Sequence, residues 1–187
     1  MRRYNLLVKE TRQIKARREN YPSKPKASKP NQIWGTDMTK VKLPHVGWAY
    51  IVVVLDWRSK KIVGHSIALR SKTDDWLEAL DRACQRQFPQ GIRLHDEISL
   101  VSDNGCQSTS HRYMQACSNL GIKQIFTSFC NPKGNADTQR MIRTMKEELV
   151  WSNEWMSYEQ LREALDHWVV EYNSTYLHSA IGYMAPN

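Results

Sequence analysis

The stretch IWGTDMTKVKL at residues 33–43 decides the fold, and GWAYIVVVLDW at 47–57 and KKIVGHSIAL at 60–69 extend the same pattern. All three runs are rich in the β-branched and aromatic residues that favour strands. Pro44 and Gly47 mark a turn after the first run, and a polar break separates the second run from the third. Connections this short predict three consecutive antiparallel strands.

Downstream, strand patterns alternate with helical ones. ISLVSD at 98–103 and IKQIFTS at 122–128 have the composition of short strands, and a helical segment lies between them. A strand, a helix and a second strand in this order predict a parallel crossover. Helices are expected over residues 71–88, with cap chemistry from Ser71 and Thr73, and over 110–120, 137–151 and 157–172. The sequence therefore predicts an α/β fold in which helices flank a mixed five-stranded sheet.

Charge divides the chain into two parts. Residues 1–30 hold ten Lys or Arg against two Glu, so this segment carries the whole net charge of +8. Its Pro- and Lys-rich end favours an extended linker. We therefore expect a basic arm and linker at 1–30 and one compact domain at 31–187. Basic arms usually meet DNA phosphates, although such an arm could also serve only solubility; the candidate DNA contacts here are Arg12, Lys15, Arg17 and Arg18.

Several classes of protein are excluded by composition. No run approaches the roughly 18 apolar residues of a membrane span, and the basic start lacks the apolar segment of a secretory signal. The cysteines form no CxxC pair and no zinc-finger spacing, which favours free thiols in a reducing compartment; they are Cys84, Cys106, Cys117 and Cys130. We expect a cytoplasmic, nucleoid-associated protein with no membrane partner.

Two carboxylates stand where a metal site could form. Asp37 interrupts the first predicted strand, where an unpaired charge is costly unless it is paired or metal-bound. Asp103 follows the apolar strand ISLVS at its carboxyl end, where open α/β sheets bind ligands, although an Asp capping a turn would look the same. Mg²⁺ and Mn²⁺ prefer anionic oxygen ligands of this kind. Gln139, which 35 residues separate from Asp103, could offer only a neutral carbonyl.

Five stretches together resemble the integrase catalytic core of bacterial insertion-sequence transposases, a branch of the ribonuclease H-like superfamily that includes retroviral integrases. They follow in the order WGTDMTKV, VVLDWRSKKIVGHSI, VSDNGCQ, NPKGNADTQRMIRTMKEEL and EYNSTYLHSAIGYMAP. They cover nearly everything from Ile33 to the end, so the resemblance is specific, whereas any single one would be weak. The resemblance implies a ribonuclease H-like fold and an enzyme that cleaves DNA ends and transfers strands.

The resemblance further implies a DD(35)E site, in which Asp37 and Asp103 share one Mg²⁺ or Mn²⁺ and a glutamate at position 139 helps to hold a second. Gln139 stands there instead. Three explanations are open: a Glu-to-Gln substitution that traps an inactive complex, a decayed natural copy, or a slip of register that puts the acid elsewhere. Glu147 and Glu148 lie about two helical turns away, roughly 12 Å along the axis, so neither replaces a ligand at 139.

Basic residues on the last part of the pattern are candidate DNA contacts. Arg143 and Lys146 follow position 139 by four and seven residues, so they share its helical face, which contacts the DNA end in related integrases. Arg143 could instead pair with Glu147 on an ordinary solvated face. Lys133 and Asn135 lie on the preceding loop, which helps to place the substrate in the family. The expected partners are transposon-end and target DNA and further copies of the chain.

Two functions follow from these observations. The first is a metal-dependent polynucleotidyl transferase core for DNA integration and transposition, inactivated or strongly impaired by Gln139. The second is a DNA-binding or regulatory protein that keeps the fold and has lost catalysis. A nuclease acting on RNA/DNA hybrids is compatible with the fold, but the Pro/Lys linker and the integrase-type tail argue against it.

Overall fold

The computed structural model describes residues 25–92, 97–127 and 134–187. Three of the cysteines, Cys84, Cys106 and Cys117, lie in these ranges and are free thiols, as the sequence predicts. Some residues with an expected role lie outside the described residues: Arg12, Lys15, Arg17, Arg18 and Lys133, together with Cys130.

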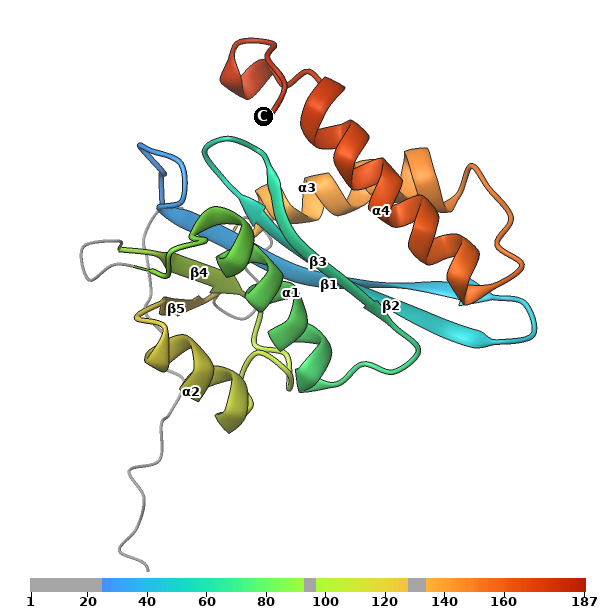
Figure 1. Cartoon of the computed structure of the whole chain (residues 1–187), viewed down its shortest axis with the longest axis horizontal. Coiled ribbons are helices and arrows are strands. Elements are labelled where there is room, and N and C mark those ends of the chain that lie inside the picture. The colour runs from blue at the N-terminus through green and yellow to red at the C-terminus, as the bar shows by residue number, and fades with distance from the viewer. Residues whose placement is uncertain (1–24, 93–96, 128–133) are drawn as a thin grey trace, which may run out of the picture.

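A single mixed sheet of five strands forms the centre of the molecule (Figure 1), as the sequence predicts. The strands lie in the order β3-β2-β1-β4-β5. The first three pair antiparallel, whereas β4 pairs parallel to β1 and β5 parallel to β4. Their bounds are β1 Ile33–Leu43, β2 Gly47–Asp56, β3 Ile62–Ala68, β4 Ser99–Ser102 and β5 Lys123–Phe126.

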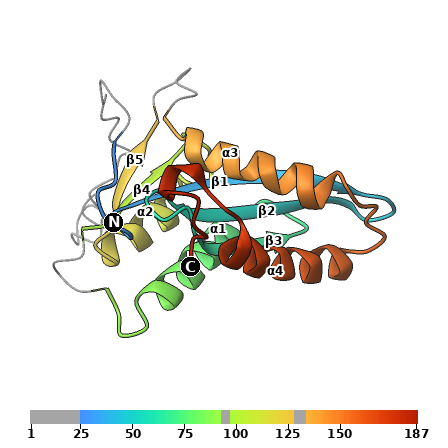
Figure 2. The same cartoon turned by 90° about the horizontal axis from the view of Figure 1, so that it is seen from above.

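Helices cover both faces of the sheet, as the two views in Figures 1 and 2 show. The side chains of α1 (Thr73–Gln87) and α2 (His111–Asn119) share one core with the face of β1 that carries Trp34. On the other face, α3 (Ala136–Met145) and α4 (Tyr158–Thr175) share a second core with Ile33, Val41 and Leu43 of β1. Alternation along β1 therefore separates the two cores.

The long helix expected at 137–151 changes form along its length. It is α-helical through α3 and continues as a π-helical turn, η2 (Lys146–Val150). A short 3₁₀ turn, η3 (Ser179–Ile181), follows α4 near the end of the chain. In the part of the chain that the structure describes, no helix is long and apolar enough to cross a membrane.

The helix starts agree with the sequence at two places and differ at a third. Ser110 accepts from the backbone N–H of Tyr113, and Ser157 accepts from that of Gln160. At α1 the N-cap is Lys72, whose backbone N–H donates to Asp75 Oδ2 at 2.7 Å. The cap expected from Ser71 and Thr73 is therefore wrong, because the Ser71 hydroxyl is engaged across the sheet, where it donates to Met38 Sδ.

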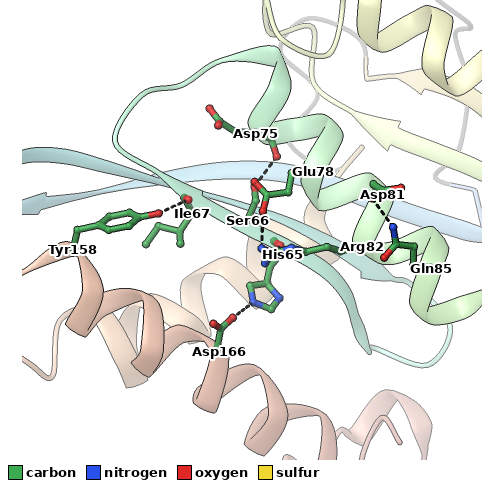
Figure 3. A network of polar contacts seen from close by, with 10 residues as sticks. All are labelled: His65, Ser66, Ile67, Asp75, Glu78, Asp81, Arg82, Gln85, Tyr158 and Asp166. Atoms are coloured by element: carbon green, nitrogen blue, oxygen red, sulfur yellow. Dashed lines mark hydrogen bonds and ion pairs between the residues drawn. The ribbon is translucent and has the colours of Figure 1, made fainter.

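The edge strand β3 is held by polar contacts from both layers (Figure 3). From α4, Asp166 Oδ1 lies 2.6 Å from His65 Nε2, and the Tyr158 hydroxyl donates to the Ile67 carbonyl at 2.8 Å. From α1, Arg82 donates to the His65 carbonyl at 3.2 Å. Further along α4, the buried Asn173 amide both accepts from and donates to the backbone of Ile62, as a neighbouring strand would. These contacts satisfy an edge that would otherwise be exposed.

Candidate active site

The register of two parallel strands brings Asp37 and Asp103 to the same edge of the sheet. The ladder between β1 and β4 ends at the pair Gly35 and Val101. Asp37 and Asp103 each follow that pair by two residues, so they lie level with each other where the parallel ladder ends. Their negative charges interact, since Asp103 is among the groups that raise the pKa of Asp37. The structure therefore places together the two acids that the sequence singles out.

The pKa of the Asp37 carboxyl is raised above its ordinary value. Burial is the main cause that raises its pKa, from 3.8 to about 6, and the Asp103 carboxylate adds to this. The Met38 backbone N–H, which donates to Asp37 Oδ1 at 2.8 Å, and the Lys146 ammonium act in the opposite direction. A buried carboxyl beside a second carboxylate gains from a bound cation, because the cation offsets both causes of the raised pKa.

Asp103 is exposed, and hydrogen bonds hold the turn in which it lies. Its side-chain Oδ1 accepts from the Gly105 backbone N–H at 3.0 Å. Its backbone carbonyl accepts from the hydroxyls of Ser102 and of the buried Ser108. Asn104 donates to the Thr127 carbonyl at the end of β5, at 2.6 Å. Asp103 can therefore both hold the turn and bind a metal ion, because the hydrogen bond within the turn uses only one of its two carboxylate oxygens.

The helix that carries position 139 sits directly on β1. Trp57 Nε1 donates to Thr138 Oγ1 at 3.1 Å, and both side chains are buried. Below them lies Gly35, where a Cβ would come within 2.0 Å of Thr138 Oγ1 and 2.3 Å of Trp57 Nε1. Only a glycine leaves room for this hydrogen bond. Gly35, which the sequence did not single out, thus fixes the start of α3 against the strand that carries Asp37.

Asn135 completes the attachment of α3. It is 3% exposed, and its side-chain amide donates to the Thr36 carbonyl of β1 at 3.0 Å. A DNA contact was expected for Asn135, but its buried position does not support one, because the amide is used inside the protein. The contact joins residues 99 positions apart, so no local pattern in the sequence indicates it.

Position 139 and the basic residues after it differ in their surroundings. Gln139 is exposed and lies one residue beyond the buried Thr138. Lys146 is partly buried and close enough to Asp37 to lower the pKa of that carboxyl. Arg143 is exposed and donates to Glu147 Oε1 at 2.8 Å, the pairing that the sequence left open as its alternative role. Of these two basic residues, Lys146 is the one whose charge acts on the Asp37 carboxyl.

The donor set fits one divalent cation. Asp37 and Asp103 supply anionic oxygens from adjacent strands, the ligand type that Mg²⁺ and Mn²⁺ prefer. Across residues 25–92, 97–127 and 134–187, no three His, Cys, Asp or Glu side chains gather into a metal-binding group. A third acidic ligand is thus missing from this pair in the described structure, and position 139 holds an amide.

Protein families and solved structures match this architecture. Two Integrase core domain models match the chain, one over residues 27–132 and the other over residues 120–186. The transposase for insertion sequence element IS904 of Lactococcus lactis is 30% identical over 163 residues, which are 86% of this chain and 62% of that protein. The transposase for insertion sequence IS3A of Escherichia coli is 26% identical over 162 residues, 86% of this chain and 54% of that protein. The chain thus spans little more than half the length of these relatives.

Among solved structures, the HTLV-2 integrase catalytic core domain in complex with magnesium superposes with a TM-score of 0.66 at 17% identity. The match covers 86% of this chain and 97% of that one. The catalytic domain of the Mos1 mariner transposase gives a TM-score of 0.62 at 16% identity and covers 75% of this chain and 70% of that one. These likenesses confirm the ribonuclease H-like fold. With the domain matches from residue 27 to residue 186 and the transposase relatives, they establish that the chain belongs to the integrase core domain family.

Proposed function

We propose that the chain is the catalytic core of an insertion-sequence transposase, a polynucleotidyl transferase that cleaves transposon ends and joins them to target DNA. The observation that carries the proposal is the pairing of Asp37 and Asp103 just beyond the end of the β1–β4 ladder, where the charge of Lys146 acts on Asp37. Two further observations support this proposal: the similarity to transposases, and the similarity in fold to the HTLV-2 integrase core, which was solved in complex with magnesium.

The protein's own groups bind and orient in this reaction, and none needs to form a covalent bond. Asp37 and Asp103 hold a negatively charged pocket that selects a cation, and Lys146 supplies a positive charge for a DNA phosphate beside it. An oxygen of water, and later the free 3′-hydroxyl of the transposon end, attacks phosphorus while the bond to the leaving 3′-oxygen breaks. Mg²⁺ or Mn²⁺, held by Asp37 and Asp103, would supply Lewis-acid stabilisation of the phosphoryl oxygens.

Gln139 occupies the position of the third ligand in this proposal and leaves the chain inactive or strongly impaired. The amide has no negative charge, and its carbonyl is a weaker ligand than a carboxylate for a hard cation. Loss of a group that only orients a ligand costs roughly 10- to 100-fold in metal affinity or activity, so loss of a ligand should cost more. We expect one ion to bind well and cleavage to lie near background.

Restoring the acid tests the proposal. Gln139→Glu, in the chain joined to an end-binding domain, should add a second ion in Mn²⁺ titrations and restore metal-dependent strand transfer. Adding Asp37→Asn or Asp103→Asn should abolish both gains. Gln115→Glu is the matched control, because it adds the same charge on α2, on the other face of the sheet, and should change neither readout.

A second candidate function has its own support in position 139. An exposed amide and the lack of a third acid near the pair, within the described ranges, fit a DNA-binding or regulatory protein that has lost catalysis. In that case Gln139→Glu would bind no further ion and remain inactive, while end-duplex binding persisted. The basic arm residues Arg12, Lys15, Arg17 and Arg18, with Lys133 and Arg143, are proposed DNA contacts in either case. Assembly on DNA as a homo-oligomer is also proposed.

A further inference from the structure

A groove lies at the far end of the β1–β2 hairpin, away from the carboxylate pair. The end of β1 lines one side, and the segment between α3 and α4 lines the other. Figure 2 shows the tip of the β1–β2 hairpin and the segment that joins α3 to α4 at the same end of the molecule. The volume of the groove is about 570 Å³. The lining residues that matter here are Lys40, Lys42, Trp48, Trp151 and Glu154. The floor of the groove is apolar and belongs to the core, through Val41, Val150 and Trp155, and none of the residues of the site around Asp37 lines it.

Tryptophan exposure singles the groove out. The chain has seven tryptophans, and five of them are buried: Trp34, Trp57, Trp76, Trp155 and Trp168. The other two, Trp48 and Trp151, are 42% and 67% exposed, and both line the groove. Large aromatic rings left in water at one place usually mark a binding surface.

The groove is also basic. Lys40 and Lys42 are exposed, and Lys40 Nζ lies 4.5 Å from the centre of the Trp48 ring. Glu154 is the only acid among the lining residues. Flat aromatic surfaces beside lysines are what single-stranded nucleic acids bind, because bases stack on the rings and phosphates pair with the cations. Lysine, by contrast, is depleted from protein–protein interfaces, which argues against a protein as the occupant.

The open edge of β1 connects the groove with the carboxylate pair. The described part of β4 pairs with β1 only as far as Gly35. Beyond this point the edge groups are met by side chains, since the Thr36 carbonyl accepts from Asn135 and the Met38 N–H donates to Asp37. Alternation along the strand puts the backbone of Lys40 and Lys42 on the same edge. At about 3.3 Å per residue, the path from Asp37 to Lys42 is roughly 17 Å long.

The helix on the other side follows the same path. Lys146, the first residue of η2, is close enough for its charge to act on Asp37, and Val150, the last residue of η2, lines the groove. The segment from Lys146 to Val150 therefore extends from the neighbourhood of Asp37 to the groove.

We propose that this groove binds a single-stranded segment of DNA that continues from the strand held at Asp37 and Asp103, with bases stacked on Trp48 and Trp151 and phosphates paired with Lys40 and Lys42. The proposal rests on the DNA-processing function proposed above and adds a binding site to it. It assigns the two tryptophans to substrate binding, a role that the charge pattern and catalytic residues do not indicate.

Intrinsic fluorescence of the full chain tests the groove directly, because only Trp48 and Trp151 are exposed. Titration with oligo(dT) should quench the emission, and Trp48→Ala/Trp151→Ala together should abolish the quenching. Each single Ala variant should weaken oligo(dT) binding at least about 5-fold, and Trp151→Phe should recover part of the loss because a ring remains. Lys40→Ala/Lys42→Ala should flatten the log–log salt slope by about 1.4.

Two matched controls separate the groove from general surface effects. Tyr183→Ala removes an aromatic ring that is 72% exposed near the C-terminus, and Arg162→Ala removes an exposed cation of α4. Both should leave quenching and affinity unchanged. Circular dichroism melting of each variant establishes that the fold is intact.

Three outcomes would overturn the proposal. One is oligo(dT) binding with no change in tryptophan emission, and another is equal affinity for the chain and the double tryptophan variant. The third is an oligomer that dissociates in that variant while DNA binding stays unchanged, which would make the groove a contact between copies.

If Gln139→Glu remains inactive but quenching persists, the groove stands and the catalytic proposal fails. If quenching is absent but Gln139→Glu is active, the catalytic proposal stands and the groove proposal fails.

Discussion

Gly35→Ala is the sharpest test of how the fold positions residue 139. The new Cβ would lie 2.0 Å from Thr138 Oγ1 and 2.3 Å from Trp57 Nε1, the two atoms that share a 3.1 Å hydrogen bond. Asn135 Oδ1 would be only 2.8 Å away. Since the methyl group would stand between donor and acceptor, the start of α3 has to move away from β1.

Two costs and one gain determine how much stability Gly35→Ala should lose. Overpacking a well-filled core costs about 1–3 kcal/mol, and leaving the buried Trp57 and Thr138 groups without their hydrogen bond costs about 1–3 kcal/mol more. Replacing a glycine returns about 0.4–1 kcal/mol by restricting the unfolded chain. We expect Gly35→Ala to lower the free energy of unfolding by about 1–6 kcal/mol.

Urea unfolding followed by circular dichroism measures this loss. Gly121→Ala serves as the control, because its methyl group meets open space at a φ of +70° and should cost only about 1–2 kcal/mol of backbone strain. Thr138→Ala should cost less in the Gly35→Ala background than in the original chain, since it removes the nearest clashing atom. A Gly35→Ala chain within about 0.5 kcal/mol of the original, or strictly additive effects of the two changes, would refute the steric argument.

Three further predictions concern charge. Asp37→Asn, without metal, should raise the free energy of unfolding by about 1–3 kcal/mol near pH 8 and leave it unchanged near pH 3.5. The reason is that a carboxyl whose pKa rises from 3.8 to about 6 on folding contributes stability that is complete below pH 3.8 and lost as the pH rises through 6; a larger effect in acid than in alkali would contradict it. The double variant Lys146→Ala/Arg143→Ala should bind a transposon-end duplex more weakly without a lower melting temperature. A loss of stability with unchanged binding would instead show that the Arg143–Glu147 pair has a structural role. Deleting residues 1–30 should flatten a log–log salt slope of roughly −4 to −5, expected if the arm neutralises on the order of 5 phosphates; equal slopes with and without the arm would rule it out as the main DNA contact.

The sequence predicts the sheet well because its strands are governed by local rules. The first predicted strand, residues 33–43, has the same bounds as β1, since apolar residues on both faces and a turn at its end leave little freedom. Asp103 follows the end of β4 in the same way, and Asp37 lies within β1, as the sequence indicates. Ser110 and Ser157 are found at helix starts because a hydroxyl next to a helical pattern is itself a local signal.

What the sequence misses depends on contacts between distant residues. The Trp57–Thr138 hydrogen bond spans 81 positions and the Asn135–Thr36 contact spans 99, so neither leaves a periodic signature. Asn135 illustrates the consequence, because a polar residue on a loop suggests a surface role, whereas in the structure it is buried. The exposure of Trp48 is likewise set by the tertiary structure, because the composition of its strand does not distinguish it from the buried tryptophans.

These long-range contacts bear on how the site could tolerate an amide at position 139. The attachment of α3 to β1 runs through Gly35, Trp57, Asn135 and Thr138, none of which uses the side chain at 139. The exposed Gln139 therefore adds nothing to the packing that sets its own position, and exchanging its amide for a carboxylate of nearly equal size should leave the helix in place. Chemistry and architecture are thus separable here. A single substitution can change the charge available to a cation at the Asp37–Asp103 pair while leaving the fold and its basic groove intact.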